Sequence, residues 1–287
     1  MDIFIINNED KNNDSFKYLN ALKEIYHSIG SEYRVILCRS RSEIIDKALY
    51  YSTIDSTRYI FSIGGNKTLN GVINGMVFSK KPLVVIPCGN NDFGDDICLL
   101  TKDTEIDLGR VNYDYFIGKL SLGLDALISS KFESLPSDKK LSYIRELLRV
   151  CPNYLGLDVK MDSTVLKLDK RVSLMSFYNC SCFGDKRIVD SSLTDGKLDL
   201  IVADNNGRLR LFYELLKFWL TEYKDTKNIS YRQVSKAHLE FNYPISYTFD
   251  GISKIDGELD VCLLPSKLLV KRELDPRIIN LGNGKKC

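Results

Sequence analysis

Short apolar runs alternate with helical stripes along the first hundred residues. The stripes place apolar side chains three or four positions apart and predict helices over 16–29, 42–51 and 69–76, with Gly30 ending the first of them. The apolar runs lie at 2–6, 33–37, 59–63 and 83–86. Continuous apolar strands separated by helices are typical of a parallel sheet covered on both faces. This part of the chain is therefore predicted to be a doubly wound α/β domain.

The pattern changes after about residue 108, where apolar and polar positions alternate in short segments separated by turn residues. These segments predict strands at 113–120, 157–162, 165–168, 172–179, 198–204, 238–241, 245–249, 259–264 and 268–271. Two helical segments interrupt them, at 138–150 and 210–223. We therefore predict an α/β domain over 1–108 and a mostly β domain, a sandwich, over 109–287. The option remains that the last residues pack back on the first domain.

Charge and composition exclude several classes of function. The 40 basic and 38 acidic residues nearly cancel, and no basic run is long enough to follow a nucleic-acid backbone, which argues against a nucleic-acid partner. The eight cysteines form no CxxC pair, and His27 and His238 are the only histidines, which argues against a His/Cys metal site.

Location is an expectation from the same sequence. The chain begins with MDIFII, which does not resemble a signal peptide, and the cysteine pattern suggests free thiols. No apolar run approaches the roughly 20 residues that span a bilayer. We expect a cytoplasmic protein whose membrane contact, if any, is peripheral at the inner face. Whether the chain forms a homodimer is left open.

The segment 59–76, YIFSIGGNKTLNGVINGM, carries the clearest chemical pattern. A buried strand runs into Gly64 and Gly65 and then into a helix. Glycines at the carboxyl end of a strand let the backbone approach a ligand, and the helix N-terminus behind them favours a phosphate. A second loop follows the next strand in PLVVIPCGNNDF, where Gly89, Asn91 and Asp92 are the polar or flexible positions. Two such loops after neighbouring strands predict a nucleotide site at that edge of the sheet.

Six motifs in this order resemble the diacylglycerol kinase catalytic-domain family, which also contains sphingosine kinases and small bacterial lipid kinases. They extend over nearly the whole chain. The motifs are GGNKTLNGVING at 64–75, PCGNNDF at 87–93, IDLGRV at 106–111, GLDA at 123–126, DGKLD at 195–199, and Asp250-Gly251 followed by PSKLLV at 265–270.

The resemblance implies an α/β nucleotide domain, a β-sandwich lipid domain and an active site in the cleft between them. It implies Mg²⁺-ATP as the donor and a lipid hydroxyl as the acceptor, with a carboxylate that accepts the hydroxyl proton. Carried over to this sequence, the nucleotide contacts are Gly64, Gly65, Asn66, Lys67, Thr68, Gly89, Asn91 and Asp92. The candidate catalytic carboxylates are Asp107, Asp125, Asp250 and Glu258, and the candidate metal ligands are Asp195 and Asp199.

The chain departs from the family pattern at several motif positions, and the threonine expected in the second loop is missing. Asn66 replaces an aspartate, Lys67 a glycine, Gly71 a glutamate, and Ile252 the glutamate of the last motif. An amide cannot take up a proton at neutral pH. A complete Asp-Gly-Glu at 256–258 is either a turn or a shifted loop that restores the carboxylate.

Three functions follow from these observations. The first is an ATP-dependent lipid kinase. The second is a catalytically impaired relative that binds nucleotide or lipid and acts through a partner. The third is an NAD-kinase relative, which the absence of a TPTGS-type segment disfavours. Two segments bear on a membrane or lipid contact. The apolar segment 209–220 with Trp219 is either a helix packed on the sandwich or a lipid-facing element. A basic helix face, formed by Lys139, Lys140, Arg145 and Arg149, is either solvated or meets lipid headgroups.

Overall fold

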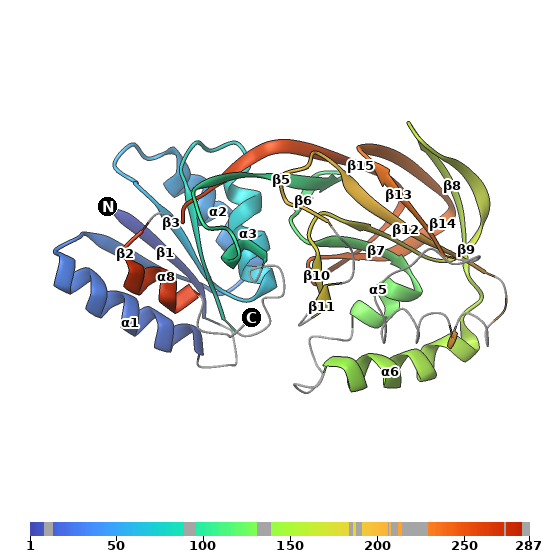
Figure 1. Ribbon diagram of the computed structural model, residues 1–287, viewed down its shortest axis with the longest axis horizontal. Helices are drawn as coiled ribbons and strands as arrows, with labels where there is room; N and C mark the ends of the chain where they lie inside the picture. Colours follow the sequence, from blue (N-terminus) through green and yellow to red (C-terminus); the bar gives the residue numbers. More distant parts are fainter. Residues whose placement is uncertain are drawn as a thin grey trace. The chain divides into compact units, whose positions relative to one another are not determined.

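The computed structural model describes residues 1–8, 14–88, 96–130, 139–183, 186–187, 191–205, 207, 212–213, 229–272 and 274–282 (Figure 1). The chain divides into two compact units. Unit 1 comprises residues 1–108 and 265–287, and unit 2 comprises residues 109–264. Two strands run along the sequence from one unit into the other, β5 (Thr104–Val111) and β15 (Ile252–Val270).

Unit 1 has the predicted α/β architecture, built on the parallel strands β1 (Asp2–Asn7), β2 (Tyr33–Cys38), β3 (Ile60–Gly64) and β4 (Leu83–Pro87). Their order in the sheet is β4-β3-β1-β2. The chain moves from β1 to β2 in one direction and then returns through β3 to β4. Right-handed crossovers consequently place α1 (Asp14–Ile29) on one face and α2 (Arg41–Thr53) and α3 (Asn66–Met76) on the other (Figure 1).

The end of the chain also belongs to unit 1. Val270, at the end of β15, pairs in parallel with Leu83 of β4. Helix α8 (Pro276–Gly282) then packs beside α1, where Ile278 joins a core of Phe4, Leu22 and Phe61. The last residues are held here because they cover apolar side chains that α1 alone leaves open.

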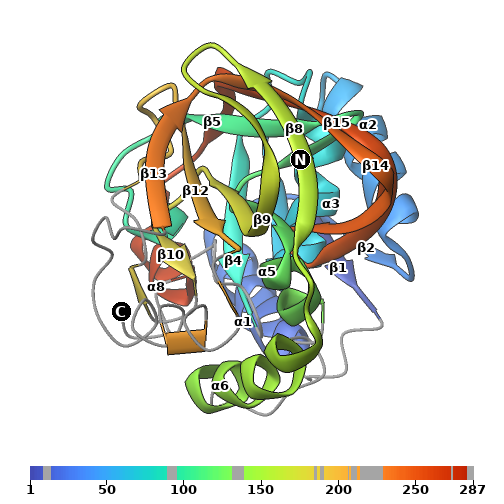
Figure 2. The same cartoon turned by 90° about the vertical axis from the view of Figure 1, so that its right-hand side faces the viewer.

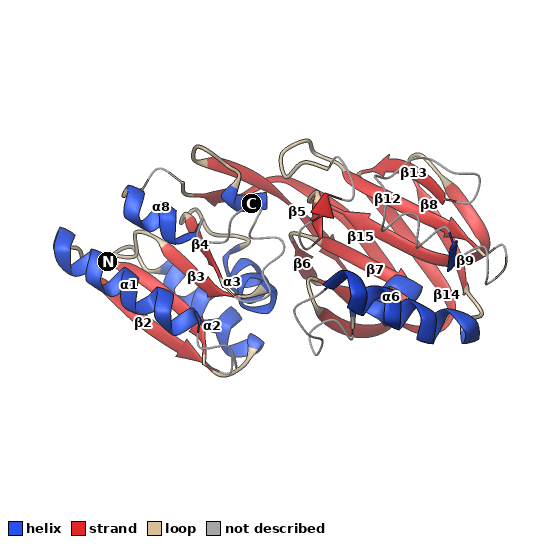
Figure 3. Ribbon diagram, turned by 60° about the horizontal axis from the view of Figure 1, so that its bottom comes forward, coloured by secondary structure: helices blue, strands red, loops and turns tan. Residues whose placement is uncertain are grey.

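Unit 2 is mostly antiparallel β structure, as the contrast between helices and strands in Figure 3 shows. Its strands are β6 (Asp114–Phe116), β7 (Lys119–Gly123), β8 (Leu157–Ser163), β9 (Lys167–Tyr178), β10 (Cys182–Phe183), β11 (Lys186–Arg187), β12 (Leu198–Asp204), β13 (Ile229–Val234) and β14 (Lys236–Phe249), together with the end of β5 and most of β15. Its helices are α5 (Leu124–Ser129), α6 (Lys139–Val150) and the 3₁₀ turn Cys151–Asn153. No described helix is long and apolar enough to cross a membrane.

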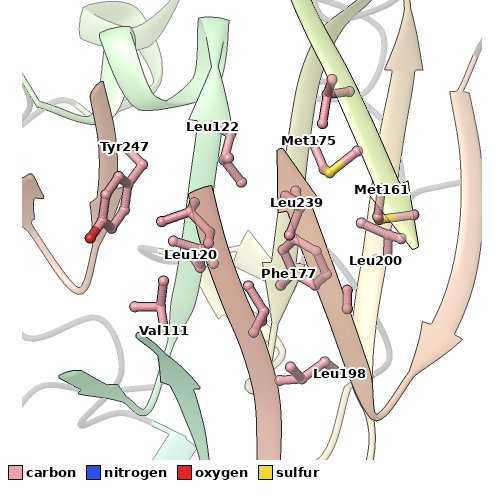
Figure 4. Packing of buried hydrophobic residues seen from close by; sticks show 14 of the residues in the cluster. Val111, Leu120, Leu122, Met161, Met175, Phe177, Leu198, Leu200, Leu239 and Tyr247 are labelled. Carbon is pink, nitrogen blue, oxygen red and sulfur yellow. The ribbon is translucent and has the colours of Figure 1, made fainter. Parts of the chain in front are cut away.

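The sheet of unit 2 closes on itself. Strand β9 pairs with β7 over one part of its length and with β8 over another, and β14 does the same. The four strands therefore form a closed ring of pairings. Beyond β9 the sheet continues to β12 and β13 (Figure 2). Where the sequence predicts a sandwich, the structure therefore has one hydrogen-bonded antiparallel set, with β10 and β11 paired separately as a two-stranded sheet. Its inward side chains, including Leu120, Phe177 and Leu239, form a continuous apolar core (Figure 4).

Several predicted strand boundaries are wrong. The predicted strand 113–120 is split into β6 and β7, because the chain between them turns to bind the Asp250 carboxylate. One long strand, β14, replaces the two predicted strands 238–241 and 245–249. Another, β15, replaces the two predicted strands 259–264 and 268–271. The β14–β15 pairing shifts register between Glu240 and Ile245, so the strand continues through the polar residues at which the pattern predicted a break. Strand β13 and helix α5 were not predicted. Of the predicted helix 210–223, only residues 212–213 are described.

Candidate functional site

The turn between β3 and α3 holds Gly64 and Gly65, the first two predicted nucleotide contacts. Gly64 has a φ of 156°, which side-chain-bearing residues rarely adopt. A Cβ added there would lie 2.6 Å from Thr68 Oγ1 and 2.9 Å from Thr68 Cβ. Only glycine fits this position, so the backbone of the turn lies directly against the first turn of α3 with no side chain in between.

The N-terminus of α3 has two features that favour an anion. Gly65 is its N-cap and offers no side-chain hydrogen bond, and the first turn contains no acidic residue. The first N–H groups of a helix have no partner within the helix, and its dipole is positive at this end. Lys67 is exposed on this turn and Thr68 is buried. Asn66 Oδ1 is buried without a hydrogen-bond partner among the described residues. The predicted contacts 64–68 occupy the end of β3 and the first turn of α3, so they form one compact group.

Gly71, which replaces the glutamate of the family motif, lies against α2. A Cβ at Gly71 would lie 2.7 Å from Ile44 Cγ2 on α2, and one at Gly75 would lie 2.4 Å from the Ile45 carbonyl oxygen. The two glycines are one helical turn apart and bring α2 and α3 into close contact. The missing glutamate is therefore a consequence of helix packing, because a larger side chain at this position would push α2 away.

A polar contact joins the same two helices beside the turn. Arg41, the first residue of α2, donates from Nε and Nη2 to Asn70 Oδ1 at 3.1 and 2.8 Å. Asn74 Nδ2 donates to the same oxygen at 3.1 Å. Sequence reasoning missed Arg41, although a basic residue after the carboxyl end of β2 was a usable indication.

The second predicted loop begins next to the first. Gly64 and Pro87 are paired in the β3–β4 register, and the Cys88 N–H donates to the Gly64 carbonyl oxygen at 3.2 Å. Gly89, Asn91 and Asp92 lie outside the described residues, and their assignment as nucleotide contacts stays a prediction.

Asp107, the second residue of the IDLGRV motif, is buried in unit 1. One of its oxygens accepts the backbone N–H of Ser266 at 2.7 Å. Ser266 has a φ of 47°, so the carboxylate stabilises a local backbone conformation that L-residues seldom adopt. The contact links the IDLGRV motif to the PSKLLV motif, and it gives Asp107 a structural partner.

Asp125 lies at the centre of a buried polar network in unit 2. It is in the first turn of α5, whose N-cap Gly123 has a φ of 70°. Lys119 Nζ lies 3.0 Å from Asp125 Oδ2, and Ser121 and Ser176 donate to the same oxygen at 2.7 and 2.8 Å.

The network keeps Asp125 ionised. Burial alone would raise the pKa of this carboxyl, but the positive charge of Lys119 and the serine hydrogen bonds hold it below its ordinary value. The sequence motif identified Asp125 and missed Lys119, although a lone lysine between apolar strand positions was an available indication.

Asp250 is held by backbone donors. Its oxygens accept the N–H groups of Ile117 and Gly118 at 2.8 and 2.9 Å, and that of Lys119 at 3.3 Å. Asp250 and Gly251 have φ values of 46° and 81° and form the β14–β15 turn. Asp125 contacts the Lys119 ammonium and Asp250 accepts the Lys119 backbone N–H, so the same residue of β7 binds both carboxylates.

Glu258 does not join them. It is exposed on β15, where it pairs in register with Glu240 of β14. The Asp-Gly-Glu at 256–258 is neither a turn nor a shifted loop, because it lies inside the long strand β15. Tyr247 donates its hydroxyl to Asp256 at 2.7 Å, which fixes that aspartate to the neighbouring strand.

The two predicted metal ligands lie in and after one turn of unit 2. Asp195 accepts the Lys197 N–H at 3.1 Å within the turn. Asp199 is fully buried on β12, where Oδ1 accepts the Tyr231 hydroxyl and, at 3.1 Å, Gln233 Nε2. Burial and this hydrogen bond raise the pKa of Tyr231. The assignment of Asp195 and Asp199 to a metal stays a prediction.

Within the described residues, no three His, Cys, Asp or Glu side chains come together as a metal site. A magnesium ion in phosphoryl transfer needs only one or two carboxylates beside the substrate phosphates, so its binding by this chain stays a prediction. The buried carboxylates at 107, 125, 199 and 250 already accept hydrogen bonds from protein donors. The turn at 64–68, by contrast, fits a nucleotide phosphate, because it combines a backbone approach without a Cβ and an uncapped helix N-terminus.

Comparison with known proteins supports the fold. No family model and no curated protein matches the sequence. Three solved structures from Bacillus anthracis str. Sterne do match, each of them a diacylglycerol kinase, the assignment being provisional for the first two. The first has a TM-score of 0.75 at 16% identity and covers 95% of this chain and 96% of its own. The second has a TM-score of 0.76 at 16% identity, covering 96% and 98%. The third has a TM-score of 0.69 at 15% identity, covering 96% and 97%. The resemblance inferred from six sequence motifs is thus confirmed at the level of the fold, and the chain has a diacylglycerol-kinase-like fold.

Proposed function

We propose that this protein is an ATP-dependent lipid kinase of the diacylglycerol-kinase type, which transfers the γ-phosphate of ATP to a lipid hydroxyl. The observation that carries the proposal is the turn at 64–68. Gly64 excludes a Cβ, Gly65 leaves the helix uncapped, and both occur at the carboxyl edge of a parallel sheet. Ligands of open α/β sheets bind at this edge.

The residues of the turn would bind the phosphates of ATP. Backbone N–H groups of the first turn of α3 would donate to phosphate oxygens, and Lys67 would add a positive charge. Phosphoryl transfer depends mainly on such positioning and charge stabilisation.

Among the candidate carboxylates, Asp125 is the best base for the lipid hydroxyl. Its oxygen Oδ2 already accepts two hydroxyl groups, from Ser121 and Ser176, so it binds the type of donor that a lipid alcohol presents. Asp250 and Asp107 accept backbone N–H groups instead and stabilise turns. The lowered pKa of Asp125 keeps it able to accept a hydrogen bond but makes it a weak base.

A second function, binding of nucleotide or lipid without turnover, is favoured by one observation. Asn66 occupies the loop position where the family pattern has an aspartate, and its amide cannot accept a proton. In that case the protein would act through a partner that recognises its ligand-bound state.

One experiment separates the two functions. Binding of ATP and binding of lipid vesicles are measured separately, by titration calorimetry and by co-sedimentation, and phosphorylated products are sought by mass spectrometry with diacylglycerol, monoacylglycerol and sphingoid bases in vesicles. ATP binding with product supports the kinase, and binding of ATP or lipid without product supports the second function. An absence of ATP binding refutes the kinase, and an absence of both ATP and lipid binding refutes both functions.

The variant Gly64→Ala should lose ATP binding, because its Cβ would collide with Thr68. Gly257→Ala is the matched control for the glycine substitution, since a Cβ there meets nothing within 4 Å. Equal ATP affinity in Gly64→Ala and wild type would show that the turn is not the nucleotide site. Circular dichroism of both variants distinguishes loss of binding from loss of fold.

A further inference from the structure

We infer that Lys119 is a positioning residue of the proposed phosphoryl transfer, which holds the Asp125 carboxylate in place to accept the proton of the lipid hydroxyl. The inference rests on the proposed function, because Asp125 is the base proposed there. It goes beyond that function because it assigns a role to a lysine that lies outside all six sequence motifs.

Lys119 reaches Asp125 from one face of the sheet of unit 2. Successive side chains of a strand point to opposite faces. Leu120 of β7 points into the apolar core (Figure 4), so Lys119 and Ser121 on either side of it point to the opposite face. Ser121 pairs in register with Ser176 of β9. Three polar side chains from two neighbouring strands therefore meet at Asp125 of α5.

The two oxygens of the Asp125 carboxylate are used unequally. Oδ2 accepts three hydrogen bonds, from Lys119 Nζ at 3.0 Å, Ser121 at 2.7 Å and Ser176 at 2.8 Å. Within the described part of the chain, Oδ1 accepts one, from the same ammonium group at 3.3 Å. Each carboxylate oxygen has about two acceptor positions, so Oδ1 has room for a further donor. In the transfer, the lipid oxygen forms a bond to the γ-phosphorus, the bond between that phosphorus and ADP breaks, and the hydroxyl proton passes to Oδ1.

Lys119 is itself held at both ends. Asp250 accepts the Lys119 N–H and donates its own N–H to the Lys119 carbonyl oxygen, both at 3.3 Å. The ammonium group lies 3.3 Å from Ser129 Oγ of α5 and 5.9 Å from the centre of the Tyr178 ring, within range of a cation–π contact. These contacts keep the positive charge beside Asp125.

Stability alone does not account for this ion pair. The side chains of Lys119 and Asp125 are only 6% and 9% exposed. A buried ion pair seldom stabilises a fold more than apolar side chains of similar size, because both charges lose their hydration. The cluster that packs α5 against the sheet includes Leu124, Ile128 and Leu174, so apolar side chains would pack there as well. A fixed carboxylate that can accept one more hydrogen bond is, by contrast, what proton transfer from a hydroxyl requires.

The charge of Lys119 also affects the pH at which Asp125 can act. Burial raises the pKa of Asp125, and the ammonium group of Lys119 together with the serine hydrogen bonds outweighs it. Other buried titratable groups on or next to the elements that pack against α5 include Tyr178 of β9, Asp250 after β14 and Glu146 of α6. None of these three contacts the Asp125 carboxylate in the structure described. Removing the Lys119 charge should therefore raise the pKa of Asp125, which a purely structural lysine would leave unchanged.

The test is the pH dependence of kcat/KM, measured with ATP, Mg²⁺ and phosphatidylcholine vesicles that contain diacylglycerol, monoacylglycerol or a sphingoid base. The variants are Lys119→Met, Asp125→Asn and the matched control Lys254→Met, which removes the lysine of another ion pair of unit 2, with Asp114. The acidic limb of the profile should move to higher pH in Lys119→Met at an unchanged KM for ATP, and Lys254→Met should keep the wild-type limb. Asp125→Asn should lose activity by a factor on the order of 10²–10⁴.

Circular dichroism establishes that each variant is folded. Should Lys119→Met not fold, Lys119→Gln replaces it, because its amide still donates a hydrogen bond but carries no charge, and the same shift of the acidic limb is expected.

The outcomes separate the inference from the proposed function. Product from wild type with an unmoved limb in the Lys119 variant overturns the inference and leaves the proposed function standing. An equal movement in Lys254→Met overturns it too, because the cause would then be a general change of charge. Wild-type rates in Asp125→Asn overturn both the inference and the assignment of the base. An absence of product from wild type at every pH overturns the proposed function and the inference together.

Discussion

The close contact between α2 and α3 makes a quantitative prediction, because it depends on two glycines that face α2. Replacing Gly75 by Ala adds a Cβ 2.4 Å from the Ile45 carbonyl oxygen, 2.7 Å from Ala48 Cβ and 2.8 Å from the Leu49 backbone nitrogen. Two of these three atoms are backbone atoms that cannot rotate away. The helices must therefore separate to accommodate one methyl group.

The magnitude follows from two opposing effects. In a helix interior, Gly→Ala stabilises by about 1 kcal/mol through helix propensity. Overpacking a tight core costs about 1–3 kcal/mol, and the backbone contacts at Gly75 place it at the upper end. We expect Gly75→Ala to lower the free energy of unfolding by about 2 kcal/mol. At Gly71 the nearest atoms are Cγ2 and Cβ of Ile44, at 2.7 and 3.1 Å, and the nearest backbone atom is at 3.6 Å, so Gly71→Ala should lie within about 1 kcal/mol of wild type.

The assay is urea unfolding followed by far-ultraviolet circular dichroism, with Gly257→Ala as a glycine substitution in open space. A shift of the Gly75→Ala midpoint to lower urea at unchanged slope gives the change in stability. A Gly75→Ala midpoint equal to or above that of wild type would refute the reasoning, since the propensity gain would then be uncompensated. The same result would also remove the packing explanation for the absence of a glutamate at Gly71.

Two further predictions concern charged groups. Asp125→Asn should destabilise the protein by about 3–5 kcal/mol, because it leaves the Lys119 ammonium buried without its carboxylate. Because the pKa of Asp125 is lowered in the folded state, its stabilisation is present above the unfolded pKa and is lost as pH falls through the folded value. Acid titration of unfolding should therefore show a loss in wild type that the variant lacks. The pKa of His238 should lie above its ordinary value because of the hydrogen bond with Asp260. In an NMR titration, Asp260→Asn should lower the pKa of His238, and an unchanged pKa would disprove the contact.

The sequence alone determined much of unit 1 and the position of its turn. Apolar strands that end in glycine and run into an apolar helical stripe have local causes: the period of the side chains and the conformational freedom of Gly64. For this reason β3, α3 and the group 64–68 could be located before any tertiary contact was known. The motif order also led correctly to a diacylglycerol-kinase-like fold.

The tertiary structure decided which polar residues are available for chemistry. Asp125 and Asp250 look alike in sequence, each following a strand, yet one accepts hydroxyl and ammonium groups and the other accepts backbone N–H groups. Ser176 lies 51 positions from Asp125, and the backbone donors to Asp250 lie up to 133 positions away along the chain. Short-range patterns contain no information on such contacts.

Packing decided the remaining differences. Gly71 was identified as a departure from the family motif, where it replaces a glutamate, but its neighbour is Ile44 on another helix. The strands β14 and β15 continue through polar positions that suggested breaks, because pairing with each other supplies their backbone hydrogen bonds. Backbone periodicity is a local property that the sequence records directly. The partners of a buried carboxylate and the space around a glycine are set only when distant segments are brought together.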